Sequence, residues 1–325
     1  MNSISRYQLA AMAVIADIFS LFCIGGSISA ATLRGMLLAA VLQFLAFLVF
    51  ASGGGKLSKT KKLLFLIYIV FCGGTVFSSL WRTSGAVYIP YEERNGIWGR
   101  LLTAGLIALV CLYSSSTGIR AVSRAALIAA AVGVICIVTD FASALFNADW
   151  KNALLPDEEN SFYELARGFA LSGGLGSFFV LSEKARGDRC HAAVVYFAVK
   201  AALTVMVLLT ALAVTGGIMC VVEFPVITAA QLSQPFEAQR IDSLFLVVFS
   251  VFAVFAAALQ VMAAAYLLKE LFPRFKRFRS TAVIILVLTA ALLMSARELI
   301  LPRAAAAIFA ILAAAIKNPL KKQRI

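Results

Sequence analysis

The sequence predicts an all-α integral membrane protein, a single membrane domain over residues 1–325 with ten transmembrane helices. Of the 325 residues, 62% are hydrophobic and only 14% are charged, and the mean hydropathy is +0.94. Soluble domains are nearer half apolar and a quarter charged, so this chain lacks the polar surface to cover itself in water. The sequence has no alternation of polar and apolar residues typical of strands, so helices are expected to satisfy the backbone hydrogen bonds in lipid. A secreted disulfide scaffold, a disordered chain and an ordinary cytosolic enzyme are excluded.

Ten apolar stretches follow one another along the chain, and a membrane helix needs roughly 20 residues. The first five lie at about residues 5–27, 31–51, 62–81, 99–115 and 121–147. The second five lie at about residues 163–182, 191–220, 241–268, 280–296 and 302–316. The seventh and eighth are long enough to tilt in the bilayer or to extend beyond it. The two sets of five, residues 1–150 and 151–325, would have opposite orientations, which predicts two inverted five-helix repeats.

The charges in the loops agree with this assignment. The chain has 29 Lys and Arg against 16 Asp and Glu, a net charge of +13. If the N-terminus is cytoplasmic, 19 basic residues fall in inner segments and eight in outer segments. The bias alternates through every loop, as the positive-inside rule requires. We therefore expect a multi-pass membrane protein with both termini in the cytoplasm, whose basic charge contacts the lipid bilayer and requires no nucleic acid.

Residues 1–30 also resemble a signal peptide, because their apolar run ends in small residues around Ser27–Ala30. Asp17 in the middle of that run argues against cleavage, as does the single basic residue ahead of it. We expect the first stretch to be retained as a span.

The cysteines and the one histidine do not form a metal or redox motif. Cys23, Cys72, Cys111, Cys136, Cys190 and Cys220 are scattered through or beside apolar runs without a C-x-x-C spacing. We interpret them as small buried hydrophobic residues. His191 lies in a charged loop. No metal site, disulfide or cofactor is predicted.

Three charged residues lie deep enough in predicted spans to be candidates. Asp17 is near the middle of the first, Asp140 is late in the fifth, and Lys200 is ten residues into the seventh. A charge at bilayer depth costs roughly 2.5–3.5 kcal/mol on insertion scales, so each residue is a functional candidate. The structural alternative is an ion pair between Lys200 and one of the aspartates, or a carboxyl group kept neutral by burial.

The sixth stretch contains Ser172-Gly173-Gly174-Leu175-Gly176-Ser177, with three glycines in four residues. Transporters built on inverted repeats break the first helix of each half near the middle of the membrane and bind the substrate there. We therefore predict a broken helix in this span. Close packing against a small-residue face is the alternative reason for such a cluster. The corresponding depth of the first span, Ala16–Ser20, has no glycine, so the symmetry only suggests a second break there.

Open helices would present carbonyl groups and helix ends to a small zwitterion. We expect Asp17 to bind an ammonium group and the amides of the Gly174–Ser177 turn to hold a carboxylate. Thr75 and Ser78, in the third span, form a small polar face that lines such a cavity or serves helix packing. The predicted substrate-binding residues are Asp17, Ser20, Thr75, Ser78, Ser172, Gly173, Gly174, Gly176 and Ser177.

The outer segment before the eighth span carries a motif. It has Phe224-Pro225-Val226-Ile227 and then Phe236, followed by Arg240-Ile241-Asp242. This resembles the aromatic-Pro and Phe…Arg-hydrophobic-Asp/Glu signature of the spore germination permease family, within the amino acid–polyamine–cation transporter superfamily. The opening Ile4–Leu9 and the segment Asn152–Pro156 look like the same family.

This resemblance implies a ten-helix, non-enzymatic permease-like subunit of a spore germinant receptor, which binds an amino acid or a similar small solute to trigger spore germination. It also implies two partners, another membrane subunit and a lipoprotein, and a location in the cell membrane or the spore inner membrane. We expect the motif residues to be structural: Pro225 stiffens the loop, and the charges of Arg240 and Asp242 hold it against the eighth span. Phe236 belongs to the same motif.

Three alternative functions are open. A secondary amino-acid transporter acting on its own would use the same fold and pocket. An intramembrane aspartyl protease needs two membrane aspartates, and Asp17 and Asp140 qualify by position, but neither lies in a G-x-G-D-like setting. A structural membrane scaffold is the third alternative, if the glycine cluster serves packing.

The loop charges give a testable topology. Cysteines introduced at Lys59 and Arg186 should be shielded from impermeant thiol reagents in intact cells, whereas a cysteine at Asn160 should be labelled, because the first two lie in basic inner segments. Labelling of the Lys59 position from outside would contradict the ten-span topology.

Overall fold

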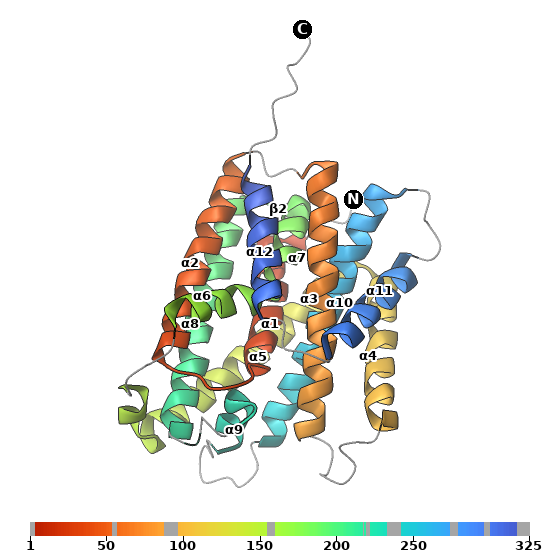
Figure 1. Cartoon of the computed structure of the whole chain (residues 1–325). Coiled ribbons are helices and arrows are strands. Elements are labelled where there is room, and N and C mark those ends of the chain that lie inside the picture. Colours follow the sequence, from red (N-terminus) through yellow and green to blue (C-terminus); the bar gives the residue numbers. More distant parts are fainter. Residues whose placement is uncertain are drawn as a thin grey trace.

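The computed structural model describes residues 4–53, 57–87, 97–154, 160–216, 218, 222–232, 242–273, 279–295 and 300–316. In these residues the chain is all-α, as the sequence predicts, apart from one pair of two-residue strands. Five of the described helices are long and apolar enough to cross a membrane, and shorter apolar helices accompany them. Figure 1 shows the long helices running side by side. The fold is thus compatible with a multi-pass membrane protein.

Each apolar stretch of the first half of the chain forms a helix. The bounds are α1 Arg6–Phe22, α2 Ala30–Ser52, α3 Lys59–Val87, α4 Ile97–Thr117 and α5 Ile119–Asn147. A single residue, Gly118, separates α4 from α5. Its φ of 89° lies in the left-handed region, which glycine adopts without steric cost.

The second half follows the same pattern with two additions. The bounds are α6 Ser161–Ala170, α7 Leu175–Leu181, α8 Arg189–Thr215, α9 Pro225–Leu232, α10 Asp242–Leu271, α11 Arg279–Ser295 and α12 Ile300–Ala315. The 3-10 turns η1 and η2 cover Trp150–Leu154 and Ser182–Lys184, and strand β1, Ile4–Ser5, pairs in parallel with β2, Ala185–Arg186. The two helices α6 and α7 share one apolar stretch, and α9 was not predicted.

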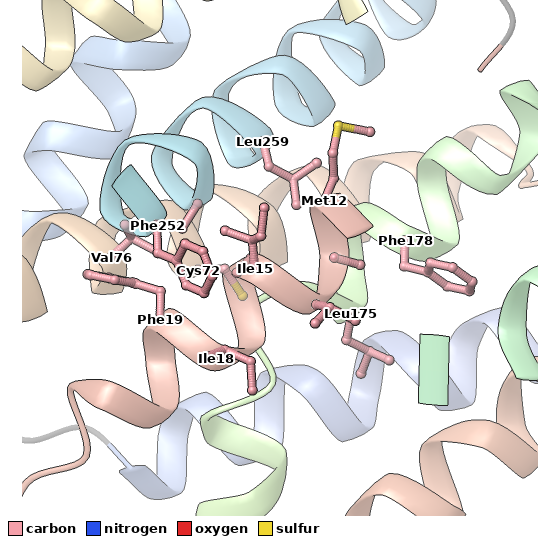
Figure 2. Close-up of a cluster of buried hydrophobic side chains, with 14 of the residues drawn as sticks. Met12, Ile15, Ile18, Phe19, Cys72, Val76, Leu175, Phe178, Phe252 and Leu259 are labelled. Carbon is pink, nitrogen blue, oxygen red and sulfur yellow. The ribbon is translucent and has the colours of Figure 1, made fainter. Parts of the chain in front are cut away.

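Helix α1 lies at the centre of the molecule. Every residue from Leu9 to Phe22 is buried, and α1 packs against α5, α7, α8 and α10. A helix that is apolar on all sides belongs in such a core. Figure 2 shows part of this core, in which α1, α3, α7 and α10 contribute Met12, Ile15, Ile18, Phe19, Cys72, Val76, Leu175, Phe178, Phe252 and Leu259.

The break suggested for the first span is not present between Ala16 and Ser20, and this expectation is wrong. Helix α1 is continuous from Arg6 to Phe22. The stretch contains no glycine, and the Ser20 hydroxyl donates to the Ala16 carbonyl inside the helix, 3.0 Å away. The chain leaves helical geometry only after Phe22, and Gly26 then takes a φ of 77°.

The break predicted for the sixth span is confirmed. Helix α6 ends at Ala170, α7 begins at Leu175, and the two are bent by 48°. The glycines are required because the break lies directly on the backbone of α1. A Cβ atom on Gly174 would lie 2.2 Å from the Ala13 carbonyl oxygen, and one on Gly173 would lie 2.5 Å from the Ser20 hydroxyl oxygen. The cluster therefore serves both the break and close packing.

The outer surface of the helices is apolar where a bilayer would cover it. Large exposed hydrophobic side chains lie on α2, α4, α5, α11 and α12, including Leu109, Tyr113, Ile128, Ile135 and Leu293. A water-soluble monomer seldom exposes so much contiguous apolar surface.

Successive loops lie at alternating ends of the helices, and the loops at each end contact one another. At one end, β1 pairs with β2, the Leu57 amide donates to Glu183 at 3.0 Å, and Lys62 forms a salt bridge with Glu270. At the other end, the Gly26 amide donates to the Glu223 carbonyl at 3.2 Å. The first set comes from segments predicted as cytoplasmic, and the second from segments predicted as external.

The structure describes the outer motif only in part. Pro225 is buried and is the first residue of α9, where its missing amide hydrogen and fixed φ suit a helix start. It therefore opens a helix and not the loop we expected. Asp242 is the first residue of α10. Phe236, Arg240 and the side chain of Asp242 lie outside the described part, so their structural role stays a prediction.

The packing at the break predicts the cost of a single methyl group. Gly174→Ala places Cβ on the backbone of α1, which cannot yield as a side chain would, so we expect a loss of about 1–3 kcal/mol or more and a lower midpoint of thermal unfolding in detergent. Gly105→Ala is the matched control, because no atom lies within 4 Å of its Cβ position in α4. Equal midpoints for the two variants would show that the break does not depend on contact with α1.

Candidate functional site

The break between α6 and α7 leaves backbone groups without helical partners, and side chains of neighbouring helices satisfy them. The Gln260 amide of α10 donates to the Gly173 carbonyl at 2.7 Å, and the Tyr68 hydroxyl of α3 donates to the Ser172 carbonyl at 3.4 Å. Arg303 of α12 donates to the Ala170 carbonyl at 2.9 Å. Unpaired backbone groups at this depth would cost several kcal/mol each in lipid. The break is thus stabilised from three helices.

The Asp17 carboxylate lies at the start of α7. One oxygen, Oδ1, accepts from the Gly174 amide at 2.7 Å. The other, Oδ2, accepts from the Tyr196 hydroxyl at 2.5 Å and lies 3.0 Å from the Lys200 ammonium. Asp17 is 4% exposed. A carboxylate is favourable at a helix start, since it complements the amide groups and the positive end of the dipole.

The Lys200 ammonium is saturated by protein groups. Besides Asp17, it donates to the Ser172 hydroxyl at 2.9 Å and to the Gln43 side-chain oxygen at 3.0 Å. An ammonium has three donors, and all three are used. The ion pair considered as a structural alternative is the arrangement observed. A ligand ammonium could reach Asp17 only by displacing Lys200.

Other predicted site residues belong to the same buried network or pack beside it. The Ser177 hydroxyl donates to Gln260 at 2.9 Å. A Cβ on Gly176 would lie 2.7 Å from the ring of Tyr68, so this glycine allows α3 to approach α7. The carboxylate pocket expected at the Gly174–Ser177 amides is filled at Gly174 by Asp17.

A polar cavity of about 70 Å³ lies next to the break, on the side of the loops predicted as external. Thr75 and Ser78, both predicted as pocket residues, line it from α3. The end of α6 contributes Ala170 and Leu171, and the chain after α1 contributes Cys23 and Gly25. The structure thus brings the predicted polar face of α3 to the cavity, and Asp17, Ser172 and Ser177 to the network beneath it. The Ser20 hydroxyl instead donates to the Ala16 carbonyl and lies against Gly173.

Three arginines line this cavity, one each from α3, α6 and α12. Arg167 is 4% exposed and donates to the carbonyls of Gly25 and Ser27, at 2.5 and 2.8 Å. Arg82 forms a salt bridge of 3.5 Å with Glu223, and Arg303 holds the Ala170 carbonyl. Arginine presents five donors in a rigid fork that suits carboxylates. Among the described residues, the cavity lining has these three cations and no acidic side chain; the carboxylate that pairs with Arg167, Glu164 at 3.4 Å, is not part of the lining.

The sequence offered a signal for some of the residues we did not single out. Gln43 and Gln260 are amides inside long apolar runs, and Arg167 is a charge inside the sixth span. Polar side chains inside membrane spans usually have polar partners, so all three could have been predicted as members of a buried polar site. Tyr68 and Tyr196 gave no signal, because tyrosines are common in membrane helices.

The remaining candidates lie elsewhere. Asp140 is half-buried and lines a separate small hollow with Phe22 and Thr210. Among the described residues, no cluster of three or more His, Cys, Asp and Glu side chains is placed to hold a metal ion.

Comparison of the chain with protein-family models and with the sequences of curated proteins gives no match. The site therefore has to be interpreted from its own geometry.

The Asp17–Lys200 pair makes a stability prediction. Asp17→Asn leaves a buried ammonium without its counter-charge and should cost about 3–5 kcal/mol, seen as a much lower unfolding midpoint. Lys200→Met should also destabilise, but the double variant should lose clearly less than the two single losses added together. Asp140→Asn, at a half-buried site, is the control and should have a smaller effect. Additive losses at Asp17 and Lys200 would show that the two charges do not stabilise each other.

Proposed function

We propose that this chain is a permease-like membrane protein that binds an amino acid or a similar small carboxylate. The observation that carries the proposal is the arginine-lined cavity beside the broken helix. Charge-assisted bonds from arginine to a carboxylate are among the strongest hydrogen bonds in proteins. The resemblance to spore germination permeases makes the specific role that of a germinant-receptor subunit, acting with another membrane subunit and a lipoprotein.

The proposed topology has ten membrane crossings in two inverted repeats, with both termini in the cytoplasm of the cell or spore. The gathering of alternate loops at two ends supports it. So does the bent α6–α7 pair, which is long and apolar enough for one crossing. In this arrangement the cavity opens toward the outer side of the membrane.

The size of the cavity limits the ligand. A water needs roughly 10–15 Å³ of such space, so about 70 Å³ holds about five waters or a small amino acid. The arginines provide for the carboxylate, and the hydroxyl oxygens of Thr75 and Ser78 keep acceptor capacity for an ammonium group. We therefore propose that the carboxylate binds at the arginines, outside the Gly174–Ser177 turn where we first expected it.

The packing on the inner side of the break favours a receptor over a free-running transporter. Beneath the break, Phe178 and Phe179 of α7 are fully buried. Phe179 stacks on Phe65 with ring centroids 5.7 Å apart, and Phe47 contacts both α7 rings at 5.0 Å. A solute moving inward has to open this aromatic cluster and the ion pair above it. A receptor needs neither event. A secondary amino-acid transporter is the alternative function, with the same site.

Binding of a small amino acid can be tested with a matched pair of probes. L-alanine and L-alaninamide differ only at the carboxylate, so the purified protein should bind L-alanine at least tenfold more tightly by calorimetry, in line with roughly 1.5–3 kcal/mol for a charged hydrogen bond. Arg303→Gln and Arg82→Gln should each weaken L-alanine binding while the protein stays folded. Arg34→Gln is the control, because Arg34 is exposed and does not line the cavity.

Three outcomes would count against the proposal: no binding of any small amino acid, equal binding of the amide, or unchanged binding in folded Arg303→Gln and Arg82→Gln. Uptake of L-alanine by protein in liposomes would select the transporter alternative.

A further inference from the structure

A second arginine cluster lies at the opposite end of the molecule, where β1 and β2 pair. It lines a hollow of about 560 Å³ with Arg6 and Tyr7 at the start of α1, Arg120 and Arg124 at the start of α5, and Arg186 in β2. The arginines come from three segments far apart in the sequence. None of the described residues lining this hollow is acidic. The proposed amino-acid site does not involve them.

This hollow has a positive potential from several sources. Arg120 and Arg124 are one helical turn apart on the same face of α5, a spacing at which like charges repel. The N-termini of α1 and α5 add the positive ends of their dipoles. Asp188 lies in the loop between β2 and α8. Its carboxylate accepts a hydrogen bond from the Cys190 amide as the N-cap of α8. Such a gathering of cations attracts an anion.

The surface next to the hollow indicates where this anion comes from. One turn after Arg124, α5 exposes Leu127 and Ile128, which are 43% and 68% accessible. The apolar surface continues along the same helix through Val132 and Ile135. A molecule with a negative head and long apolar tails fits this continuity, whereas a soluble anion gains nothing from it.

We infer that the hollow formed by Arg6, Arg120, Arg124 and Arg186 binds the phosphate head of an anionic membrane lipid, whose chains lie along α5. Guanidinium groups bind phosphate oxygens in pairs, and the exposed ring of Tyr7 has the amphipathic character that suits a membrane interface. Under the proposed topology the hollow faces the cytoplasmic leaflet, where basic residues near the surface bind anionic lipids. The lipid would fix the start of α5 against α1 and β2.

The test uses the full-length protein in nanodiscs of phosphatidylcholine with and without phosphatidylglycerol. Native mass spectrometry of the released protein should show phosphatidylglycerol retained over phosphatidylcholine, and phosphatidylglycerol should raise the midpoint of thermal unfolding. Arg124→Gln with Arg186→Gln should reduce retention about tenfold, since each basic residue near an anionic surface contributes to binding. The control is Lys59→Gln with Lys269→Gln, which removes the same charge at exposed positions of the same end, outside the hollow.

The same readouts separate a bound lipid from general charge attraction and from free phosphate. Equal losses in the two double variants would show attraction to net charge only and would overturn the inference. So would equal retention of the two lipids by the wild-type protein. Inorganic phosphate, added to phosphatidylcholine nanodiscs, should leave the unfolding midpoint of the wild-type protein unchanged at millimolar concentration. An arginine-dependent rise would make the site one for free phosphate and would refute a lipid headgroup.

Discussion

The contact on which this structure depends is the Asp17 carboxylate at the break between α6 and α7. It joins three elements, because it bonds the Gly174 amide of the break, the Tyr196 hydroxyl and the Lys200 ammonium of α8. An isolated carboxylate in the middle of an apolar core is very costly, and an isolated ammonium is as well. Each is tolerated here because the other is present and because neutral donors and acceptors complete both. Helix α1 can therefore be the centre of the core and still carry a charge.

This interaction also determines which functions the break can serve. In a break with free amides and carbonyls, a ligand would bind directly to the backbone. Here Gln260, Tyr68 and Arg303 hold the carbonyls of Gly173, Ser172 and Ala170. The polar groups that line the cavity above the break are the arginines and the hydroxyls. For that reason the chemistry we assign to the site is recognition of a carboxylate in the adjacent cavity, and not coordination at the turn.

The sequence predicted those features that depend on local chemistry. Every apolar stretch became a helix, because helix formation in such a composition follows from backbone satisfaction alone. The break at Gly173 and Gly174 was predictable because glycine density is a local signal. Pairing was not. From the sequence, Asp17 and Asp140 were equally available to Lys200. Helix α8 packs against both α1 and α5, but Asp140 lies beside Thr210, further along α8, so the tertiary packing selects Asp17. The comparison of the two halves wrongly suggested a break in the first span. Helix α1 contains no glycine, and it stays continuous through Asp17.

The cavity and the buried network are connected through one side chain. Arg303 lines the cavity and at the same time donates to the Ala170 carbonyl at the end of α6. A carboxylate that takes bonds from this guanidinium competes with that carbonyl, and Ala170 is two residues before Ser172, whose hydroxyl accepts from Lys200. If a carboxylate occupies the cavity as proposed, it would act on the last turn of α6 and, through Ser172, on the ion pair with Asp17. A ligand can shift a conformational equilibrium only through groups whose contacts differ between the states, and under the proposed function Arg303 would be such a group. Binding on the outer side could in this way change the packing of the broken helix while the aromatic cluster beneath it stays closed.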